Sequence, residues 1–301
     1  MKQTIKKLLN QTAYIKNLLT QVANQGAFPA GHYYSPIPSQ DEVREYLRSR
    51  KPPGDNVPGI DLNADGQWEL LQDFAGYYAD LPFVEKETAG RRYYYENGWF
   101  NYFDGMALYG ILRKFSPKRI IEVGSGYSSA AMLETIESVP LSDVQLTCIE
   151  PYPDRLNSLL TPADKQRVTV ISQKVQDVPR DLFSTLTAGD LLFIDSSHVL
   201  KCASDLHFLM FEILPQLPTG VLVHFHDVFY PFDYPDAWLT EGRYWNENYF
   251  LRAFLTNNSA WKIVFFNTFV DHAFGDFLRE RMPLSLKDTG GSLYLQRIAN
   301  D

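Results

Sequence analysis

Short apolar runs alternate with longer segments of helical periodicity over most of the chain beyond about residue 104. Strands of four or five apolar-rich residues are predicted at 119–123, 145–149, 168–172, 191–194 and 220–224. Helices are predicted between and beside them, at 105–115, 129–139, 154–160, around 182 and at 200–214. Strands that alternate with helices favour right-handed crossovers and a parallel sheet covered on both faces.

The end of the chain has a different pattern. A helix is predicted at 248–256, followed by a strand at 261–267, a long loop and a last strand at 292–297. No helical pattern strong enough for a crossover separates these two strands, so we expect an antiparallel pair at one sheet edge. The predicted fold is therefore α/β, a doubly wound and mostly parallel seven-stranded sheet with an antiparallel last strand.

The first hundred residues are predicted to form a helical and loop-rich cap. Apolar residues three and four apart between Ile5 and Val22 indicate a helix, which packs on its own domain or forms a homodimer seam. Ser39 and Glu42 have the spacing of a capping box, and a helix should follow at 67–78. We expect residues 1–100 to form this cap and residues 101–301 to form a Rossmann-like domain.

Composition narrows the class of protein. The chain has 301 residues, of which 45% are hydrophobic and 21% charged, as in ordinary globular proteins. Its 28 Lys and Arg against 36 Asp and Glu give a net charge of −8, which argues against a nucleic-acid partner. No apolar run approaches the ~18 residues that span a bilayer, so no membrane partner is expected. The acidic balance favours a small-molecule or neutral substrate, and two cysteines in apolar runs, Cys148 and Cys202, suit a reducing compartment, so we expect a cytoplasmic protein.

The segment from Arg119 to Ser129 carries the strongest binding signal. Its apolar strand runs directly into a Gly124-Ser125-Gly126 turn, and a helix begins immediately afterwards. Glycines allow a sharp turn and a close approach to a ligand, and the helix N-terminus presents free amides. Glu122 lies inside the strand end, and Glu150 ends the next strand, where a carboxylate can accept hydrogen bonds from ribose hydroxyls. The pattern predicts a nucleoside ligand.

This pattern resembles the class I S-adenosylmethionine-dependent methyltransferases over residues 102–298, in the branch of small-molecule O-methyltransferases. The resemblance implies S-adenosylmethionine as cofactor, with its ribose held by Glu150 and its adenine amino group by Asp177. It implies that the remaining cofactor contacts come from the glycine turn and from the fourth strand end. Those residues are Glu122, Gly124, Ser125, Gly126, Tyr127, Ser128 and Asp195.

Two polar clusters at predicted strand ends are candidates for the chemistry. Asp195 and His198 follow the fourth strand, and His226 and Asp227 follow the fifth, so all four should meet at one sheet edge. One hypothesis is a Mg²⁺ or Mn²⁺ site formed by Asp195, His226 and Asp227. The other is a general base, His198 or His226, oriented by Asp195 or Asp227; His198 is favoured because it opens a predicted helix. His224 is interpreted mainly as a core residue.

The function that follows is in-line methyl transfer to a small molecule, expected at oxygen, with a sugar, a phenolic compound or another natural-product-like molecule as acceptor. Aromatic segments at 93–103 and 229–235 suit either kind of ring. One alternative is an NAD(P)-dependent oxidoreductase with a degenerate loop, in which Ser129 replaces the third glycine of the dinucleotide fingerprint. Another is a nucleoside-binding protein without catalytic activity.

Overall fold

The computed structural model describes residues 26–141 and 143–298. The predicted N-terminal helix, and with it the predicted homodimer seam, lies outside these ranges. The described chain divides into two compact units. The smaller one comprises residues up to Pro52 and the segment Pro235–Tyr244, and the larger one comprises Pro53–Tyr234 and the chain from Trp245 onward. The predicted role of residues 1–100 as a cap stays a prediction.

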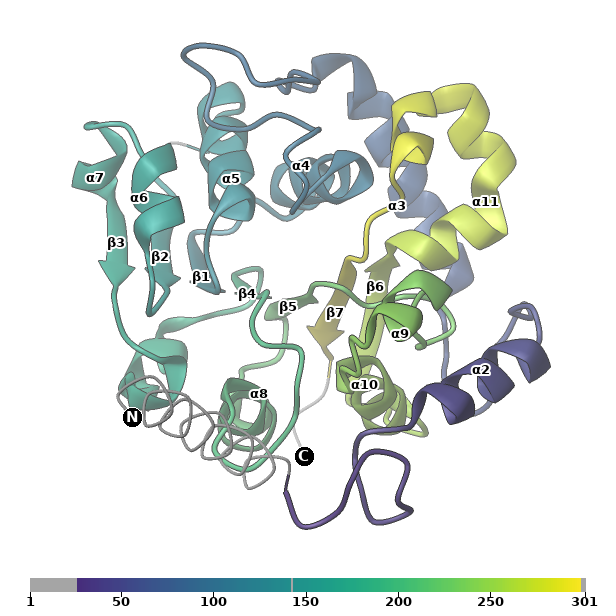
Figure 1. Cartoon of the computed structure of the whole chain (residues 1–301). Helices are drawn as coiled ribbons and strands as arrows, with labels where there is room; N and C mark the ends of the chain where they lie inside the picture. The colour runs from purple at the N-terminus through teal and green to yellow at the C-terminus, as the bar shows by residue number, and fades with distance from the viewer. Residues whose placement is uncertain (1–25, 142, 299–301) are drawn as a thin grey trace, which may run out of the picture. The chain divides into compact units, whose positions relative to one another are not determined.

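The larger unit is built on a seven-stranded sheet of order β3-β2-β1-β4-β5-β7-β6. All neighbouring strands pair in parallel except β7, which is antiparallel to both β5 and β6 (Figure 1). The predicted fold class is thereby confirmed. The strands are β1 (Arg119–Val123), β2 (Gln145–Ile149), β3 (Val168–Ile171), β4 (Leu191–Ile194), β5 (Leu222–Phe225), β6 (Trp261–Phe266) and β7 (Leu293–Arg297).

Helices cover both faces of the sheet (Figure 1). The helices on one face share a hydrophobic cluster with Ile120 and Phe193; they are α3 (Ala64–Tyr77), α4 (Tyr102–Phe115), α5 (Tyr127–Ser138), α6 (Asp154–Leu159) and α11 (Asn267–Arg281). Elements on the other face share a second cluster with Ile121 and Ile194; they are η2 (Val175–Asp177), η3 (Arg180–Thr185), α8 (Asp205–Phe208), η4 (Leu209–Ile213), η5 (Leu214–Gln216) and α10 (Glu247–Leu255). Three short elements complete the unit: η1 (Tyr78–Asp80), α7 (Asp164–Arg167) and η6 (Pro283–Lys287).

Two predictions of secondary structure are wrong. Residues 267–281 form helix α11, where a loop was expected between the last two strands. The backbone of Phe274 is non-helical and kinks this helix, so its apolar residues do not keep one period. The helix expected at 200–214 begins only at Asp205, and residues 209–213 continue it as a π-helix. Its N-cap is Ser204, whose hydroxyl accepts a hydrogen bond from the amide of His207.

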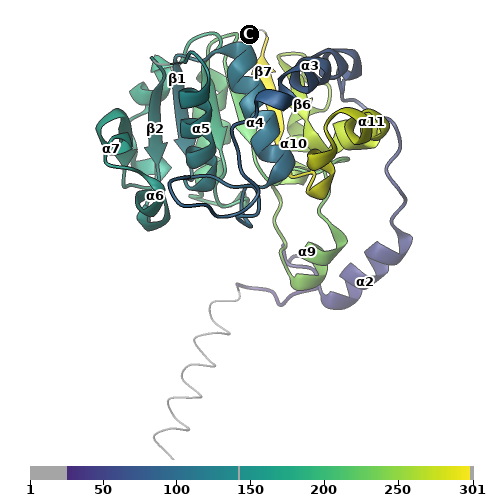
Figure 2. The same ribbon diagram turned by 90° about the horizontal axis from the view of Figure 1, so that it is seen from above.

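The smaller unit contains α2 (Gln40–Ser49) and α9 (Asp236–Glu241), which contact each other (Figure 2). The predicted capping box is confirmed: the Ser39 hydroxyl accepts from the amide of Glu42, and the Glu42 carboxylate accepts from the amide of Ser39. Arg50 forms an ion pair with Asp236 at 2.8 Å. Across the described ranges of both units, no helix is long and apolar enough to cross a membrane.

Candidate active site

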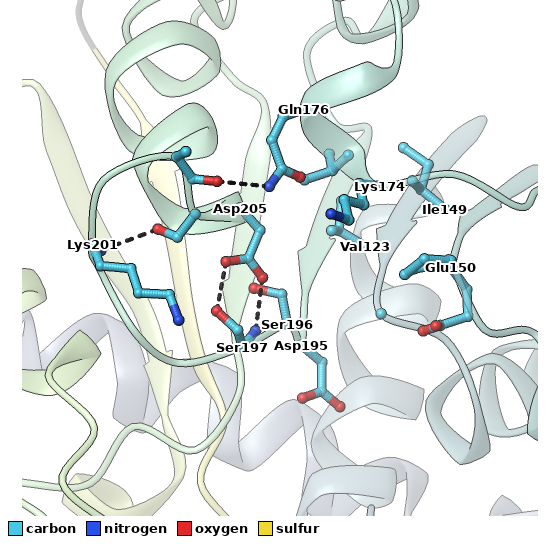
Figure 3. Close-up of a pocket in the computed structure, with 15 residues that line it drawn as sticks. Val123, Ile149, Glu150, Lys174, Gln176, Asp195, Ser196, Ser197, Lys201 and Asp205 are labelled. Atoms are coloured by element: carbon cyan, nitrogen blue, oxygen red, sulfur yellow. Dashed lines mark hydrogen bonds between the residues drawn. The ribbon is translucent and has the colours of Figure 1, made fainter. Parts of the chain in front are cut away.

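A pocket of about 420 Å³ opens at the carboxyl ends of β1, β2 and β4 (Figure 3). The strand order reverses between β1 and β4, which is where open parallel sheets bind their ligands. The walls come from the loops that follow these strands, from the segment after β3 and from the start of α8. They include Gly124, Glu150, Pro151, Lys174, Gln176, Asp195, Ser196, Ser197, Lys201, Ser204 and Asp205.

Gly124 allows the loop after β1 to pack directly on the loop after β4. Its φ of +80° is in the left-handed region that glycine favours, and a Cβ there would overlap the carbonyl oxygen of Asp195. Two backbone hydrogen bonds hold the close approach, from the Gly124 amide to the Ile149 carbonyl at 3.0 Å and from the Asp195 amide to the Val123 carbonyl at 2.9 Å. The glycine turn is therefore a fixed wall of the pocket.

Glu150 lies in the pocket at the end of β2, as its predicted ribose-binding role requires. One carboxylate oxygen accepts from the amide of Ser125 at 3.2 Å and the other from the amide of Tyr152 at 2.8 Å. These bonds orient the carboxylate and leave each oxygen free to accept from a ligand hydroxyl. Ser196 adds a buried hydroxyl oxygen that has no hydrogen-bond partner in the described ranges. Residues of this kind fit the polar part of a nucleoside cofactor.

Other predicted cofactor residues lie behind the pocket or beside it. Glu122 is fully buried on the side of α5, where it accepts hydrogen bonds from Ser128 at 2.6 Å, from Ser129 and from Cys148. Burial raises its pKa to about 7, although these hydrogen bonds oppose the shift. Glu122 and Ser128 thus support the glycine turn from its buried side, next to α5. The other predicted residues outside the pocket wall are Ser125, Gly126, Tyr127 and Asp177, and Gln176 lines the wall in place of Asp177.

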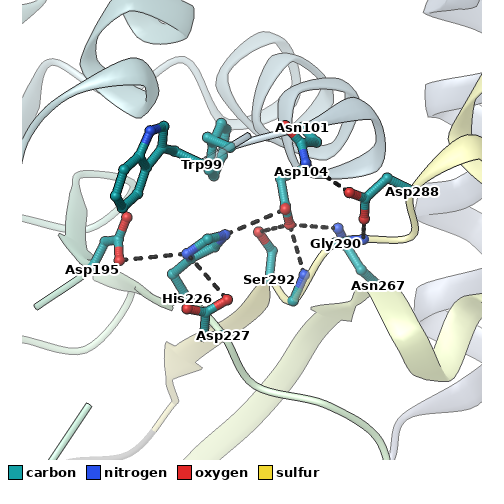
Figure 4. A network of polar contacts seen from close by, with 12 residues as sticks. Trp99, Asn101, Asp104, Asp195, His226, Asp227, Asn267, Asp288, Gly290 and Ser292 are labelled. Carbon is teal, nitrogen blue, oxygen red and sulfur yellow. Dashed lines mark hydrogen bonds and ion pairs between the residues drawn. The ribbon is translucent and has the colours of Figure 1, made fainter. Parts of the chain in front are cut away.

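The second polar cluster is centred on His226, which follows β5 (Figure 4). Its Nδ1 lies 3.4 Å from Asp195 and 3.7 Å from Asp227, and its Nε2 lies 3.3 Å from Asp104. Asp104 comes from α4 and is itself held by Asn267, by the amide of Gly291 and by the hydroxyl of Ser292. Both nitrogens of this imidazole therefore face carboxylates.

His198 has a matching arrangement on the other side of the two aspartates. Its Nδ1 lies 2.8 Å from Glu247 of α10, and its Nε2 lies 3.5 Å from both Asp195 and Asp227. The Trp245 ring stacks on the imidazole, with ring centroids 4.4 Å apart. His198 and Asp227 both have a φ of +58°, a strained conformation for residues other than glycine. The fold thus holds these two side chains in place at a backbone cost of ~1–3 kcal/mol each.

The cluster shifts the proton affinity of its members in opposite directions. Burial alone would lower the pKa of His198, but Glu247, Asp227 and Asp195 raise it to about 9. The same balance, with Asp195, Asp227 and Asp104, raises the pKa of His226 well above its usual range. His226 and His198 in turn hold the pKa of Asp195 at about 2 against the effect of burial, whereas burial raises the pKa of Asp227.

His224 is a core residue, in agreement with its main interpretation from sequence. Its ring is fully buried, stacks on Phe193 with centroids 3.7 Å apart, and places Nε2 3.0 Å from the Ser292 hydroxyl. Burial lowers its pKa well below the usual value, and the charge of His226 adds to this. His224 therefore contributes a neutral ring that supports the cluster.

The predicted divalent-metal site of Asp195, His226 and Asp227 stays a prediction. The imidazoles of His226 and His198 lie beside both aspartates and can compensate their charges without a cation. In the ranges that the structure describes, no group of three or more His, Cys, Asp or Glu side chains is arranged to hold a metal ion. The described residues therefore give the metal hypothesis no support.

The structure brings Asp195, His198, His226 and Asp227 together, and it adds two carboxylates that the sequence interpretation missed. Asp104 and Glu247 come from helices distant in sequence from the strand ends. Asp104 could have been found from the sequence, because it is the one charged residue in the apolar run Tyr102–Met106 and a buried charge needs a partner. Glu247 could not have been found in this way, since acidic residues are common in the first turn of helices. The argument that His198 opens a helix is wrong, because α8 begins only at Asp205.

Comparison with known proteins places this site in a family. A family model described as a methyltransferase domain matches residues 121–228, which run from β1 to the loop after β5. An uncharacterised protein of Archaeoglobus fulgidus is 35% identical over 167 residues, which cover 53% of this chain and 73% of the relative. The chain therefore belongs to the methyltransferase family, and its resemblance to the class I S-adenosylmethionine-dependent enzymes is confirmed.

Solved structures are similar only at a lower level. The O-methyltransferase TomG of Streptomyces achromogenes, solved with S-adenosylmethionine, is 18% identical with a TM-score of 0.40; 80% of this chain and 92% of TomG are covered. The methyltransferase PaMTH1 of Podospora anserina, solved with S-adenosylhomocysteine, is 16% identical with a TM-score of 0.41; 86% of this chain and 95% of PaMTH1 are covered. Values this low carry no conclusion about substrate or mechanism.

Proposed function

We propose that the protein transfers a methyl group from S-adenosylmethionine to a hydroxyl oxygen of a small molecule. The observation that carries the proposal is the position of Asp195. This residue lines the pocket at the strand-order reversal and also lies 3.4 Å from His226 and 3.5 Å from His198. Asp195 thus joins the proposed cofactor site to the cluster of titratable side chains that can accept a proton.

The pocket residues would hold and orient the cofactor, which supplies a methyl group already activated by a positive sulfur. Glu150 would accept hydrogen bonds from the ribose hydroxyls, and the glycine turn would allow the chain to lie close to the ligand. The buried hydroxyl of Ser196 offers a further polar contact. These residues bind and align without taking part in bond making, which is what a pre-activated methyl group requires.

Proton removal would fall to a carboxylate. The side chains of Asp195 and Asp227 are 27% and 19% exposed, whereas those of His198 and His226 are only 9% and 6% exposed. An acceptor hydroxyl therefore reaches the carboxylates more readily than the imidazoles. Asp227, whose pKa is raised by burial, is the better base of the two, because the pKa of Asp195 is about 2.

In this proposal the two histidines are positioning residues. Each imidazole faces carboxylates through both nitrogens, so each is held protonated and partly compensates the charges of Asp195 and Asp227. This replaces the hypothesis of a neutral imidazole base. The acceptor oxygen would donate its proton to Asp227 as its bond to the methyl carbon forms.

Titration calorimetry with S-adenosylhomocysteine tests the cofactor assignment. The native protein should bind this compound and should not bind NAD. Glu150→Ala should weaken binding by about 10- to 100-fold, because two hydrogen bonds to a charged group are lost. Glu87→Ala, which removes an exposed glutamate outside the pocket wall, is the matched control and should leave affinity unchanged. Absence of binding, or equal binding by the Glu150 variant, would contradict the assignment.

A further inference from the structure

Trp99 is an exposed aromatic side chain on a rigid turn. Its side chain is 60% exposed, although the adjoining Phe100 is buried in the core. The Asn97 side chain fixes the turn: its oxygen accepts from the amides of Trp99 at 2.9 Å and Phe100 at 2.8 Å, and its nitrogen donates to the carbonyls of Tyr94 and Phe100. The guanidinium of Arg155 lies 3.7 Å from the centroid of the indole. The indole is thus presented on a fixed backbone, with the Arg155 guanidinium lying over the ring.

The turn lies where the pocket and the histidine cluster meet. Figure 4 shows the indole of Trp99 beside Asp195, next to His226. The ring of Phe100 packs on that of His226, with centroids 5.3 Å apart. Arg155 lies beside the glycine turn, since its Cδ is 3.2 Å from where a Cβ of Gly126 would be. The indole therefore flanks both the proposed cofactor turn and the carboxylates.

The groups around the Trp99 indole favour one of the two acceptor classes, sugars and phenolic compounds, that the sequence leaves open. Ionised Asp195 and Asp227 only accept hydrogen bonds, and beside the imidazoles of His198 and His226 each carboxylate is still partly exposed, so both can accept from hydroxyl groups of a ligand. A pocket for a planar phenol is expected to be lined mainly by apolar and aromatic side chains. Here, Arg155 covers part of the indole, and the neighbouring side chains are charged. One exposed indole beside the carboxylates of Asp195 and Asp227 fits a ring that has C–H bonds on one face and hydroxyl groups around its edge.

We propose that the acceptor is a sugar or a similar polyhydroxylated ring, which stacks on Trp99 and donates hydroxyl hydrogen bonds to Asp195 and Asp227. This inference rests on the proposed methyl transfer and names its substrate class. Trp99 would set the position of the sugar ring, and the two carboxylates would select which hydroxyl is methylated. A planar phenol would also stack on the indole, but it offers fewer hydroxyl donors than a sugar ring: one in p-coumarate and two in catechol.

Saturation-transfer NMR on the full chain, in the presence of S-adenosylhomocysteine, tests the assignment. The probes are the methyl pyranosides of glucose, mannose and galactose, compared with catechol and p-coumarate. At least one pyranoside should show saturated ring C–H signals, and neither phenol should bind as strongly. Trp99→Ala should reduce the signal at least tenfold, whereas Trp99→Phe should retain most of it. Phe211→Ala, which removes an exposed aromatic ring outside the pocket wall, should leave it unchanged.

Failure of this inference can be told apart from failure of the proposed function. Calorimetry on the native protein reports whether S-adenosylhomocysteine binds, and circular dichroism with thermal unfolding of Trp99→Ala reports whether the variant is folded. If S-adenosylhomocysteine binds but no pyranoside does, or if the phenols bind better, the sugar assignment is wrong while the methyltransferase proposal stands. Pyranoside binding that survives Trp99→Ala would also overturn it. If S-adenosylhomocysteine does not bind the native protein, the proposed function itself fails.

Discussion

The carboxylate of Glu247 lies 2.8 Å from Nδ1 of His198, and both side chains are buried. The pair joins the loop after β4 to the first turn of α10, two segments 49 residues apart in the chain. Each partner would be costly to bury alone, because an uncompensated charge loses its hydration. The contact therefore fixes the direction in which Nε2 of His198 points, which is toward Asp195 and Asp227.

Glu247→Gln should lower the pKa of His198, since the hydrogen bond to Glu247 raises that pKa more than any other contact. A histidine whose folded pKa is raised stabilises the protein fully below its unfolded pKa of about 6.5, and this contribution is lost as pH rises through about 9. The free energy of unfolding attributable to His198 is on the order of 3 kcal/mol. The free energy of unfolding of the variant, measured by urea unfolding, should fall less steeply than that of the native protein between pH 6.5 and 9. Glu280→Gln, at an exposed position of α11, should keep the native slope.

Gly124→Ala should abolish cofactor binding and destabilise the fold. The new Cβ would meet the carbonyl of Asp195, and alanine disfavours a φ of +80°. We expect a loss of more than ~2 kcal/mol in the free energy of unfolding and no thermal shift on addition of S-adenosylhomocysteine. Gly76→Ala is the control, because Gly76 lies in α3 with open space around it. That change should be neutral or stabilise by up to ~1 kcal/mol, as is usual in helices. A Gly124 variant that binds normally would refute the proposed close packing.

Asp227→Asn should separate binding from catalysis. The amide cannot take up the acceptor proton, so we expect kcat for the preferred pyranoside to fall by about 10²- to 10⁴-fold. Affinity for S-adenosylhomocysteine should change little, because Asp227 is not among the residues that line the pocket. Asp195→Asn should reduce both quantities, since Asp195 belongs to both sites. An exposed change in α11, Asp276→Asn, should affect neither. Turnover that survives Asp227→Asn would assign the base elsewhere.

Chelation should leave the protein unaffected. The acidic groups at the strand ends face the imidazoles of His198 and His226, so their charge is compensated by side chains of the chain itself. We expect the Tm and the rate of methyl transfer to be the same with and without EDTA. A drop in either quantity that Mg²⁺ or Mn²⁺ restores would reinstate the divalent-metal hypothesis.

The parallel core was predictable because its strands are short, apolar and bounded by turn residues. The limits of β1, β2 and β4 agree with those expected from sequence at both ends. Helix α11 was not predictable in the same way: it is interrupted at Phe274, and its buried residues, which include Phe269, Val270 and Leu278, span the kink. A period search assumes one straight axis and fails where the axis changes direction.

The residues of the candidate site divide in the same way between predictable and unpredictable ones. Asp195, His198, His226 and Asp227 follow strands, and parallel strands bring their carboxyl ends to a common edge, so their convergence could be inferred from order alone. Asp104 and Glu247 belong to helices, whose rotation about their own axes decides whether a side chain reaches the edge. That rotation depends on packing against the sheet, which one sequence does not specify. The four polar residues at the carboxyl edge of the sheet could therefore be predicted from sequence, but the two helix carboxylates that balance the charge of the histidines could not.

The reversed direction of β7 has a consequence for the order in which the contacts around Asp104 can form during synthesis. Because this strand runs opposite to β5, the residues just before it, Gly291 and Ser292, lie at the carboxyl end of β5 and donate hydrogen bonds to Asp104. A nascent chain halted ahead of them already contains every residue that lines the pocket and the Asn267 contact to Asp104, but it lacks the other two hydrogen bonds that hold this carboxylate behind His226. The last strand therefore both joins β5 to β6 in the sheet and completes the hydrogen bonds around Asp104, so the buried polar network depends on this strand.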